Sequence, residues 1–149
     1  MQDRIEKSVD LRASISRVWR ALTDHKEFGE WFRVQLDGPF VVGEVSRGRT
    51  TYPGYEGLKW EAMIVAMEPE RLFAFKWCPY AHDDGRDHSK VPLTLVEFRL
   101  EPTAGGSRLV ISESGFDDLP DDPLRIDALR SNTEGWGLQA NSLAAYVQS

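Results

Sequence analysis

The sequence predicts an α+β fold in which a curved antiparallel β-sheet of about six to seven strands packs around a long C-terminal helix. One extended segment and two short amphipathic segments open the chain, short extended segments separated by turn residues fill the middle, and apolar residues recur at helical spacing from Asp121 onward. Strands and helices that are segregated along a chain favour an α+β layer arrangement, which can leave a cavity between sheet and helix. The length of 149 residues indicates a single domain over residues 1–149.

The N-terminal part is expected to form one strand and two short helices. An extended segment spans about residues 4–12, and Ser14 or Ser16 can then cap the first helix. Three apolar residues share one face of that helix: Val18, Trp19 and Leu22. Asp24 and Glu27 have the spacing of a capping box at the start of the second helix. The second helix carries three aromatic residues: Phe28, Trp31 and Phe32.

Five further strands are expected in the middle of the chain. They cover about residues 40–52, 57–68, 71–78, 92–102 and 107–116. Tight turns at 68–71 and 103–106 make neighbouring strands antiparallel. Alternation places Phe73, Phe75 and Trp77 on one face, with Ala74 and Lys76 on the other. Val96, Phe98 and Leu100 alternate in the same way with charged residues, so the sheet is expected to have one apolar and one wet face.

The last segment is expected to be a long helix that starts at Asp121-Asp122-Pro123, where Asp can cap and Pro suits the first helical position. A stripe of mostly apolar residues must be covered by the sheet: Leu129, Asn132, Trp136, Gln139 or Ala140, Leu143, and Tyr146 or Val147. Gly135 and Gly137 flank Trp136 and weaken the helix. Close packing and a kink are both open explanations for these glycines.

Four groups of residues give the chain a resemblance to a known family: 18–24 with Trp31-Phe32, 68–72 leading to Trp77, 105–109 leading to 113–116, and 132–136 followed by 143–146. In this order they resemble the START-like, helix-grip superfamily (SRPBCC), and within it the family of homologues of the heat-shock-protein-90 ATPase activator. The resemblance implies a seven-stranded antiparallel sheet around a C-terminal helix, commonly with an apolar pocket between them. It implies little about chemistry, because the superfamily includes lipid carriers, hormone- and flavonoid-type binders and polyketide aromatase/cyclases.

Charge and composition exclude several classes of partner. The net charge of -6 argues against a nucleic-acid footprint and against adsorption to anionic membranes. No apolar run reaches the length of a membrane span, and the single cysteine, Cys78, cannot form an internal disulfide. We therefore expect a soluble cytoplasmic protein without nucleic-acid or membrane partners and without a cofactor. A chaperone partner has only the family resemblance behind it.

Glu113 and Asn132 are the polar candidates for a functional site. Glu113 continues the interior face set by Leu109 and Ile111, where a carboxylate is costly unless it is hydrogen-bonded. It either meets a ligand in a pocket, as an orienting group or an acid/base, or lies at a strand end, wet or satisfied by Asn132 or a backbone N–H. Asn132 interrupts the apolar stripe of the last helix. It either offers a donor and an acceptor to a ligand or ties the helix to the sheet.

Aromatic residues supply the remaining pocket candidates. Six of them are expected to line a pocket between sheet and helix: Trp31, Trp60, Phe75, Trp77, Phe98 and Trp136. Core packing is the competing explanation for each of them. His82 to His88 gathers two imidazoles and three carboxylates, but it lacks a recognised ligand spacing and is expected to be a solvated loop without metal.

The sequence therefore predicts a non-enzymatic protein that binds a small, mostly apolar or aromatic, or lipid-like molecule between sheet and terminal helix. Apolar area would supply affinity, and Glu113 or Asn132 would orient the ligand. Two alternatives stay open. One is a polyketide-cyclase-like or hydrolase-like enzyme that uses Glu113 as acid or base. The other is a chaperone-interacting module, as the family resemblance suggests.

Overall fold

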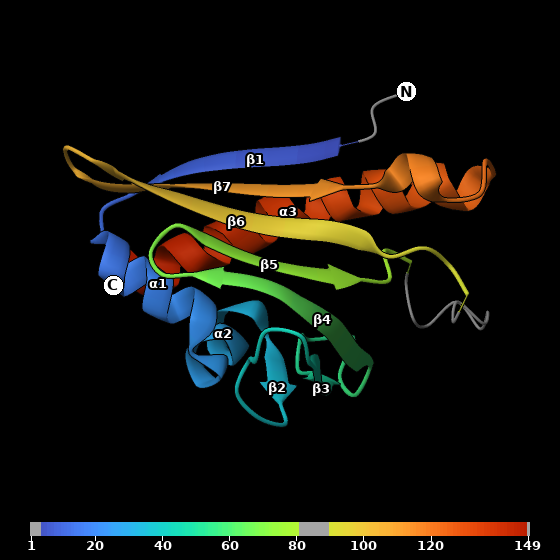
Figure 1. Cartoon of the computed structure of the whole chain (residues 1–149), viewed down its shortest axis with the longest axis horizontal. Coiled ribbons are helices and arrows are strands. Elements are labelled where there is room, and N and C mark those ends of the chain that lie inside the picture. Colours follow the sequence, from blue (N-terminus) through green and yellow to red (C-terminus); the bar gives the residue numbers. More distant parts are fainter. Residues whose placement is uncertain (1–3, 81–89, 149) are drawn as a thin grey trace.

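The computed structural model describes residues 4–80 and 90–148 and confirms the α+β, helix-grip fold class (Figure 1). Seven strands form one antiparallel sheet in the order β1-β7-β6-β5-β4-β3-β2. The strands are β1 (Arg4–Leu11), β2 (Val34–Leu36), β3 (Val45–Thr50), β4 (Lys59–Glu68), β5 (Leu72–Trp77), β6 (Thr94–Thr103) and β7 (Gly106–Ser114). The helices are α1 (Ile15–Thr23), α2 (His25–Phe32) and α3 (Pro123–Gln148), with a 3-10 turn at Phe116–Asp118. α3 lies behind the sheet in Figure 1.

The strand β2 was not predicted, and two predicted strands are too long. Three residues are too few to show an alternating pattern, so β2 is defined by its pairing with β3, in which Leu36 lies opposite Gly48. An added Cβ at Gly48 would lie 2.2 Å from the carbonyl oxygen of Gln35, so only glycine fits there. The segment predicted over 40–52 is a strand only from Val45, because a turn at Gly43 precedes it. β7 ends before Gly115, whose φ of 101° breaks the strand.

The predicted helix starts are confirmed. The Ser14 hydroxyl accepts from the backbone N–H of Arg17 at 3.1 Å, and Asp24 Oδ1 accepts from the N–H groups of Lys26 and Glu27 at 2.9 and 3.2 Å. A complete capping box also needs a hydrogen bond from the Asp24 N–H to the Glu27 side chain. This bond does not form, because the Asp24 N–H donates to the carbonyl of Arg20. The Glu27 side chain points away from its own helix start.

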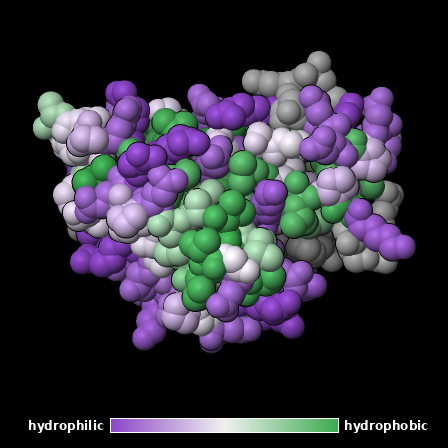
Figure 2. Space-filling view, viewed as in Figure 1, coloured by the Kyte–Doolittle hydropathy of each residue, from purple (hydrophilic) through white to green (hydrophobic). Residues whose placement is uncertain are grey.

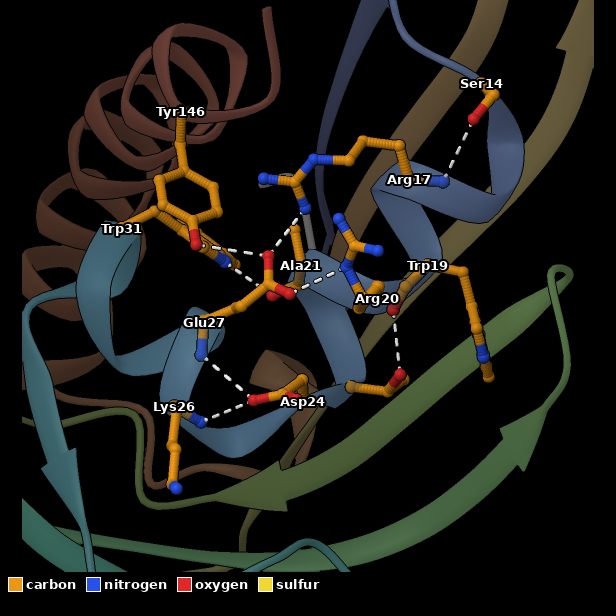
Figure 3. Close-up of polar contacts among 11 residues, drawn as sticks. Ser14, Arg17, Trp19, Arg20, Ala21, Asp24, Lys26, Glu27, Trp31 and Tyr146 are labelled. Atoms are coloured by element: carbon orange, nitrogen blue, oxygen red, sulfur yellow. Dashed lines mark hydrogen bonds and ion pairs between the residues drawn. The ribbon is translucent and has the colours of Figure 1, made fainter. Parts of the chain in front are cut away.

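Glu27 instead joins the three helices at one point (Figure 3). Its carboxylate accepts from Arg17 Nη1 at 2.5 Å, from Arg20 Nε at 2.8 Å and from the Tyr146 hydroxyl at 3.1 Å. The Arg17 guanidinium also lies 5.1 Å from the centre of the Tyr146 ring. Burial raises the pKa of Glu27, but the hydrogen bonds from Arg17 and Tyr146 and the two positive charges lower it by more, so its pKa lies below the ordinary value.

The inner face of the sheet confirms the predicted alternation and is filled by aromatic rings. Phe73, Phe75 and Phe98 are fully buried, and Trp31 and Trp60 contact them. α3 covers this face, and four members of the predicted stripe are buried: Trp136, Ala140, Leu143 and Val147. Ala128, which the stripe did not include, is buried where Leu129 was expected. The helix starts at Pro123 as expected, and Asp122 Oδ1 accepts from the N–H of Leu124 at 2.8 Å.

The outer face of the sheet is less polar than predicted. Figure 2 shows hydrophobic residues gathered near the middle of this face. Val41, Val42 and Val65 are exposed, and backbone hydrogen bonds of Gly43 and Glu44 with Ile64 hold the 41–44 turn beside β4. The alternating pattern identified the inner face correctly but did not predict apolar residues on both faces of β4.

Close packing does not explain the two glycines of α3. An added Cβ at Gly135 or Gly137 would meet no atom within 4 Å, and the helix runs without interruption over 26 residues. Both glycines instead lie beside surface hollows.

The first prediction concerns acid stability. Because the pKa of Glu27 is lowered in the folded state, its contribution is complete above the unfolded pKa of about 4.3 and is lost as the pH falls through the folded pKa. We expect Glu27→Gln to lower the free energy of unfolding at pH 7 by about 1–2 kcal/mol. Urea unfolding should show this difference shrinking at about pH 3. As a control, Glu30→Gln at the exposed neighbouring position should change the free energy of unfolding by under about 0.5 kcal/mol at either pH. A loss of stability in Glu27→Gln that does not depend on pH would contradict the assignment.

The second prediction concerns Gly137, which lies beside the groove between β1 and α3. Gly137→Ala should raise the free energy of unfolding by about 0.5–1 kcal/mol, because it adds helix propensity without a clash. In thermal denaturation, the melting temperature should rise by about 2–4 °C for each kcal/mol of added stability. The reverse change at an exposed site of the same helix, Ala145→Gly, should lower stability by a similar amount. Loss of stability in Gly137→Ala would mean that the helix needs a distorted backbone at this position.

Candidate functional site

A single buried carboxylate organises the site. Glu113 lies near the end of β7, opposite Ile5 of β1 and Val96 of β6, and its side chain is 0% exposed. The prediction that it faces the interior with Leu109 and Ile111 is confirmed. The alternative of a wet carboxylate is wrong, because the sheet and α3 enclose Glu113 completely. The alternative that Asn132 satisfies it at the strand end agrees with the hydrogen bonds from Asn132 Nδ2.

Four neutral side chains donate to Glu113. Trp77 Nε1 at 2.9 Å and Thr94 Oγ1 at 2.6 Å donate to Oε2, and Trp136 Nε1 donates to Oε1 at 2.8 Å. Asn132 Nδ2 lies 3.2 and 3.3 Å from the two oxygens. An indole N–H can only donate, so this set suits an ionised carboxylate, which only accepts. Within residues 4–80 and 90–148, no Lys, Arg or His forms an ion pair with Glu113.

Asn132 ties α3 to the sheet. Besides Glu113, its Nδ2 donates to the carbonyl oxygen of Pro79 at 3.2 Å. Because every partner on this side is an acceptor, the amide orientation is determined and Oδ1 must point the other way. Oδ1 accepts none of the hydrogen bonds found in the described parts of the chain. One half of the amide is therefore structural, and the other half is an acceptor on the surface of α3.

A cleft opens beside Asn132, between α3 and the end of the sheet that β4 and β5 form. α3 packs mainly against β1, α1 and α2, which leaves its β4 side uncovered. The first lobe has a volume of about 460 Å³, and its aromatic lining is Phe32, Trp60, Trp77 and Tyr80. The second lobe, about 490 Å³, adds Tyr52, Tyr55 and Trp136. Both lobes share four residues: Phe32, Trp77, Ser131 and Asn132. We call the two lobes together the α3 cleft.

The residues predicted to form a pocket occupy three different places. Trp60, Trp77, Trp136 and Asn132 line the α3 cleft. Glu113 lies behind its wall, where it holds the two indoles and the amide. Phe75 and Phe98 are fully buried in the ring-filled core, and Trp31 borders a separate hollow between α2 and α3, where its indole N–H donates to the Ala21 carbonyl at 2.8 Å.

Several residues of the cleft were not predicted. They include Phe32 and Tyr80, both buried, and the exposed Tyr52 and Tyr55 of the loop between β3 and β4. A loop residue follows no periodic pattern, so the sequence carried no signal for the two exposed tyrosines. Burial, followed by the negative charge of Asp122, raises the pKa of Tyr80, which keeps its phenol neutral.

Residues 82–88, expected to form a solvated loop without metal, lie outside the described residues. Within 4–80 and 90–148, no three His, Cys, Asp or Glu side chains gather in a way that could hold a metal ion. None of the helices in that part of the chain is long and apolar enough to cross a membrane.

A family model described as Activator of Hsp90 ATPase homolog 1-like protein matches residues 12–148. The chain belongs to this family. The match confirms the predicted resemblance, and it covers every element of the site from the aromatic residues of α2 to Trp136. Membership in the Activator of Hsp90 ATPase homolog 1-like family is compatible with interaction with a ligand or a chaperone in general. No curated protein matches the sequence significantly.

Solved structures share the fold of this family member at low sequence identity. MLL2253 from Mesorhizobium loti is 22% identical with a TM-score of 0.76, over 96% of this chain and 95% of that one. The Aha1 dimer from Colwellia psychrerythraea is 16% identical with a TM-score of 0.73, over 99% of this chain and 97% of that one. DynU16 from the dynemicin biosynthetic locus is 21% identical with a TM-score of 0.76. The match covers 100% of this chain and 48% of DynU16.

The third prediction tests the buried carboxylate. Glu113→Gln places an amide NH₂ against an indole N–H, which can only donate, and removes charge-assisted hydrogen bonds. We therefore expect the free energy of unfolding to fall by about 2–4 kcal/mol. Urea denaturation followed by tryptophan fluorescence measures this change. The exposed carboxylate of Glu101, altered to Gln, should cost under about 0.5 kcal/mol. Equal stability of Glu113→Gln and the wild type would contradict the hydrogen-bond assignment.

Proposed function

We propose that this protein binds a small apolar or aromatic molecule with a hydrogen-bond donor in the α3 cleft. One observation carries the proposal: the Asn132 amide oxygen has no partner within the described residues, and its amide is oriented from behind by Glu113 and Pro79. An acceptor fixed in this way on an aromatic wall is the arrangement that ligand sites use to orient a bound molecule.

The size and lining of the cleft support binding of a compact ring system. Each lobe lies within the range of about 300–1,000 Å³ that is common for small-molecule sites. Trp60, Trp77 and Phe32 pack against one another, with ring centres 5.3 to 6.3 Å apart, so the wall is rigid and is formed before a ligand arrives. A rigid apolar wall needs little ordering on binding and favours affinity.

The location differs from the one expected from the sequence. The space under the middle of the sheet is filled by Phe73, Phe75 and Phe98, whose rings contact one another. The proposed site is therefore the open side of the helix grip, near the N-terminal half of α3, and not a chamber in its centre.

The enzymatic alternative has less support. Glu113 has no exposed surface, and both of its oxygens are already hydrogen-bonded to the protein. A general acid or base must come within hydrogen-bond reach of its substrate. Glu113 acts in our proposal as a positioning residue for Asn132. A chaperone partner has the family description in its favour, and no feature of the cleft adds to it.

The fourth prediction tests the cleft with two probes of equal ring size. Isothermal titration calorimetry should show that 1-naphthylmethanol, which carries a hydroxyl donor, binds about tenfold more tightly than 1-methylnaphthalene, because only the alcohol can donate to Asn132 Oδ1. Ser131→Trp fills the cleft from an exposed position and should abolish binding of both probes. Asn141→Trp, on another part of the α3 surface, is the matched control and should bind both normally. Absence of binding to the wild type, or unchanged binding in Ser131→Trp, would refute the proposal.

A further inference from the structure

We infer that the α3 cleft selects a cationic ligand, an ammonium ion carried on an apolar or aromatic body. This inference rests on the proposed function and adds the charge of the ligand. Three independent features lead to it: the charge behind the cleft wall, the aromatic faces on the wall and the charges around the mouth.

The charge behind the wall is not neutralised by the protein. Glu113 is 0% exposed, and all four of its donors are neutral. A buried anion without a cation produces a negative potential that the low dielectric of the interior screens poorly. The cleft lies on the other side of Trp77, Trp136 and Asn132, so this potential extends into it.

The aromatic faces suit a cation. Trp77 and Trp136 donate their N–H groups to the carboxylate, and donation to an anion shifts electron density into the indole ring. Indole faces bind cations best among aromatic side chains. The second lobe adds Tyr52 and Tyr55 to Phe32, which lines both lobes. The unpartnered amide oxygen of Asn132 is an acceptor that suits an N–H donor. Asn132 lines both lobes together with Phe32 and Trp77, so one ammonium group would meet the acceptor and the rings together.

The mouth of the cleft has an excess of negative charge. Among the described residues, its charged lining consists of three anions, Glu61, Asp127 and Glu134, and one cation, Lys59. Lys59 Nζ lies 3.6 Å from Glu61, so these two charges offset each other. Arg47 lies beyond them and pairs with the same carboxylate at 3.4 Å. Asp127 and Glu134 of α3 form no ion pair in the described parts of the chain, and the net charge of -6 adds a favourable long-range field.

The test compares 1-naphthylmethylammonium with 1-naphthylmethanol, which share ring and linker and differ in charge. At low ionic strength, isothermal titration calorimetry should give a dissociation constant at least about tenfold lower for the ammonium. High salt should reduce this preference, because the exposed charges at the mouth are screened. The Asp127→Asn/Glu134→Gln double variant should reduce the preference, measured as the ratio of the two dissociation constants in that variant. Glu101→Gln removes one charge far from the cleft and should leave the preference unchanged.

The outcomes separate this inference from the proposed function. Equal affinities for the two probes, or a preference for the alcohol, would overturn the charge selectivity and leave the binding function in place. Binding of neither probe would refute the proposed function, and the inference with it. A preference for the ammonium that survives in Ser131→Trp would place the cation elsewhere on the protein and would also overturn the inference.

Discussion

The burial of one carboxylate is the constraint on which the rest of this structure depends. Removing Glu113 from water costs several kcal/mol unless strong hydrogen bonds replace the lost hydration. The donors come from the end of β5, the start of β6 and the middle of α3. Satisfying the carboxylate therefore requires that helix and sheet meet in one register, which a purely apolar contact between them would specify less sharply.

The same constraint shapes the surface outside it. The indole rings of Trp77 and Trp136 are turned by their N–H bonds so that their remaining surface forms the wall of the α3 cleft, and the amide of Asn132 is held with its oxygen free. The same three residues thus stabilise the buried carboxylate and form part of the cleft surface. The charge of Glu113 reaches the cleft through these rings, since no cation of the described chain neutralises it.

The helix grip is closed at one side and open at the other. Near the C-terminal end of α3, Glu27 binds Arg17, Arg20 and Tyr146, and Ser142 donates to the Trp31 carbonyl at 2.6 Å. These contacts hold α3 against the two short helices. The N-terminal half of α3 lacks such covering helices, and the space left there is the cleft.

The sequence by itself determined the order of elements apart from β2, the starts of the helices, the buried faces of β5, β6 and β7 and the interior position of Glu113. These features follow from local spacing, because strand and helix periods decide which residues share a face. The tertiary structure alone decided which donors reach Glu113, that Glu27 binds two arginines and not its own helix start, and that Phe75 and Phe98 fill the core while Trp77 borders an open cleft. A periodic pattern places a side chain on a face, but an empty volume depends on how side chains distant in sequence fill the same space.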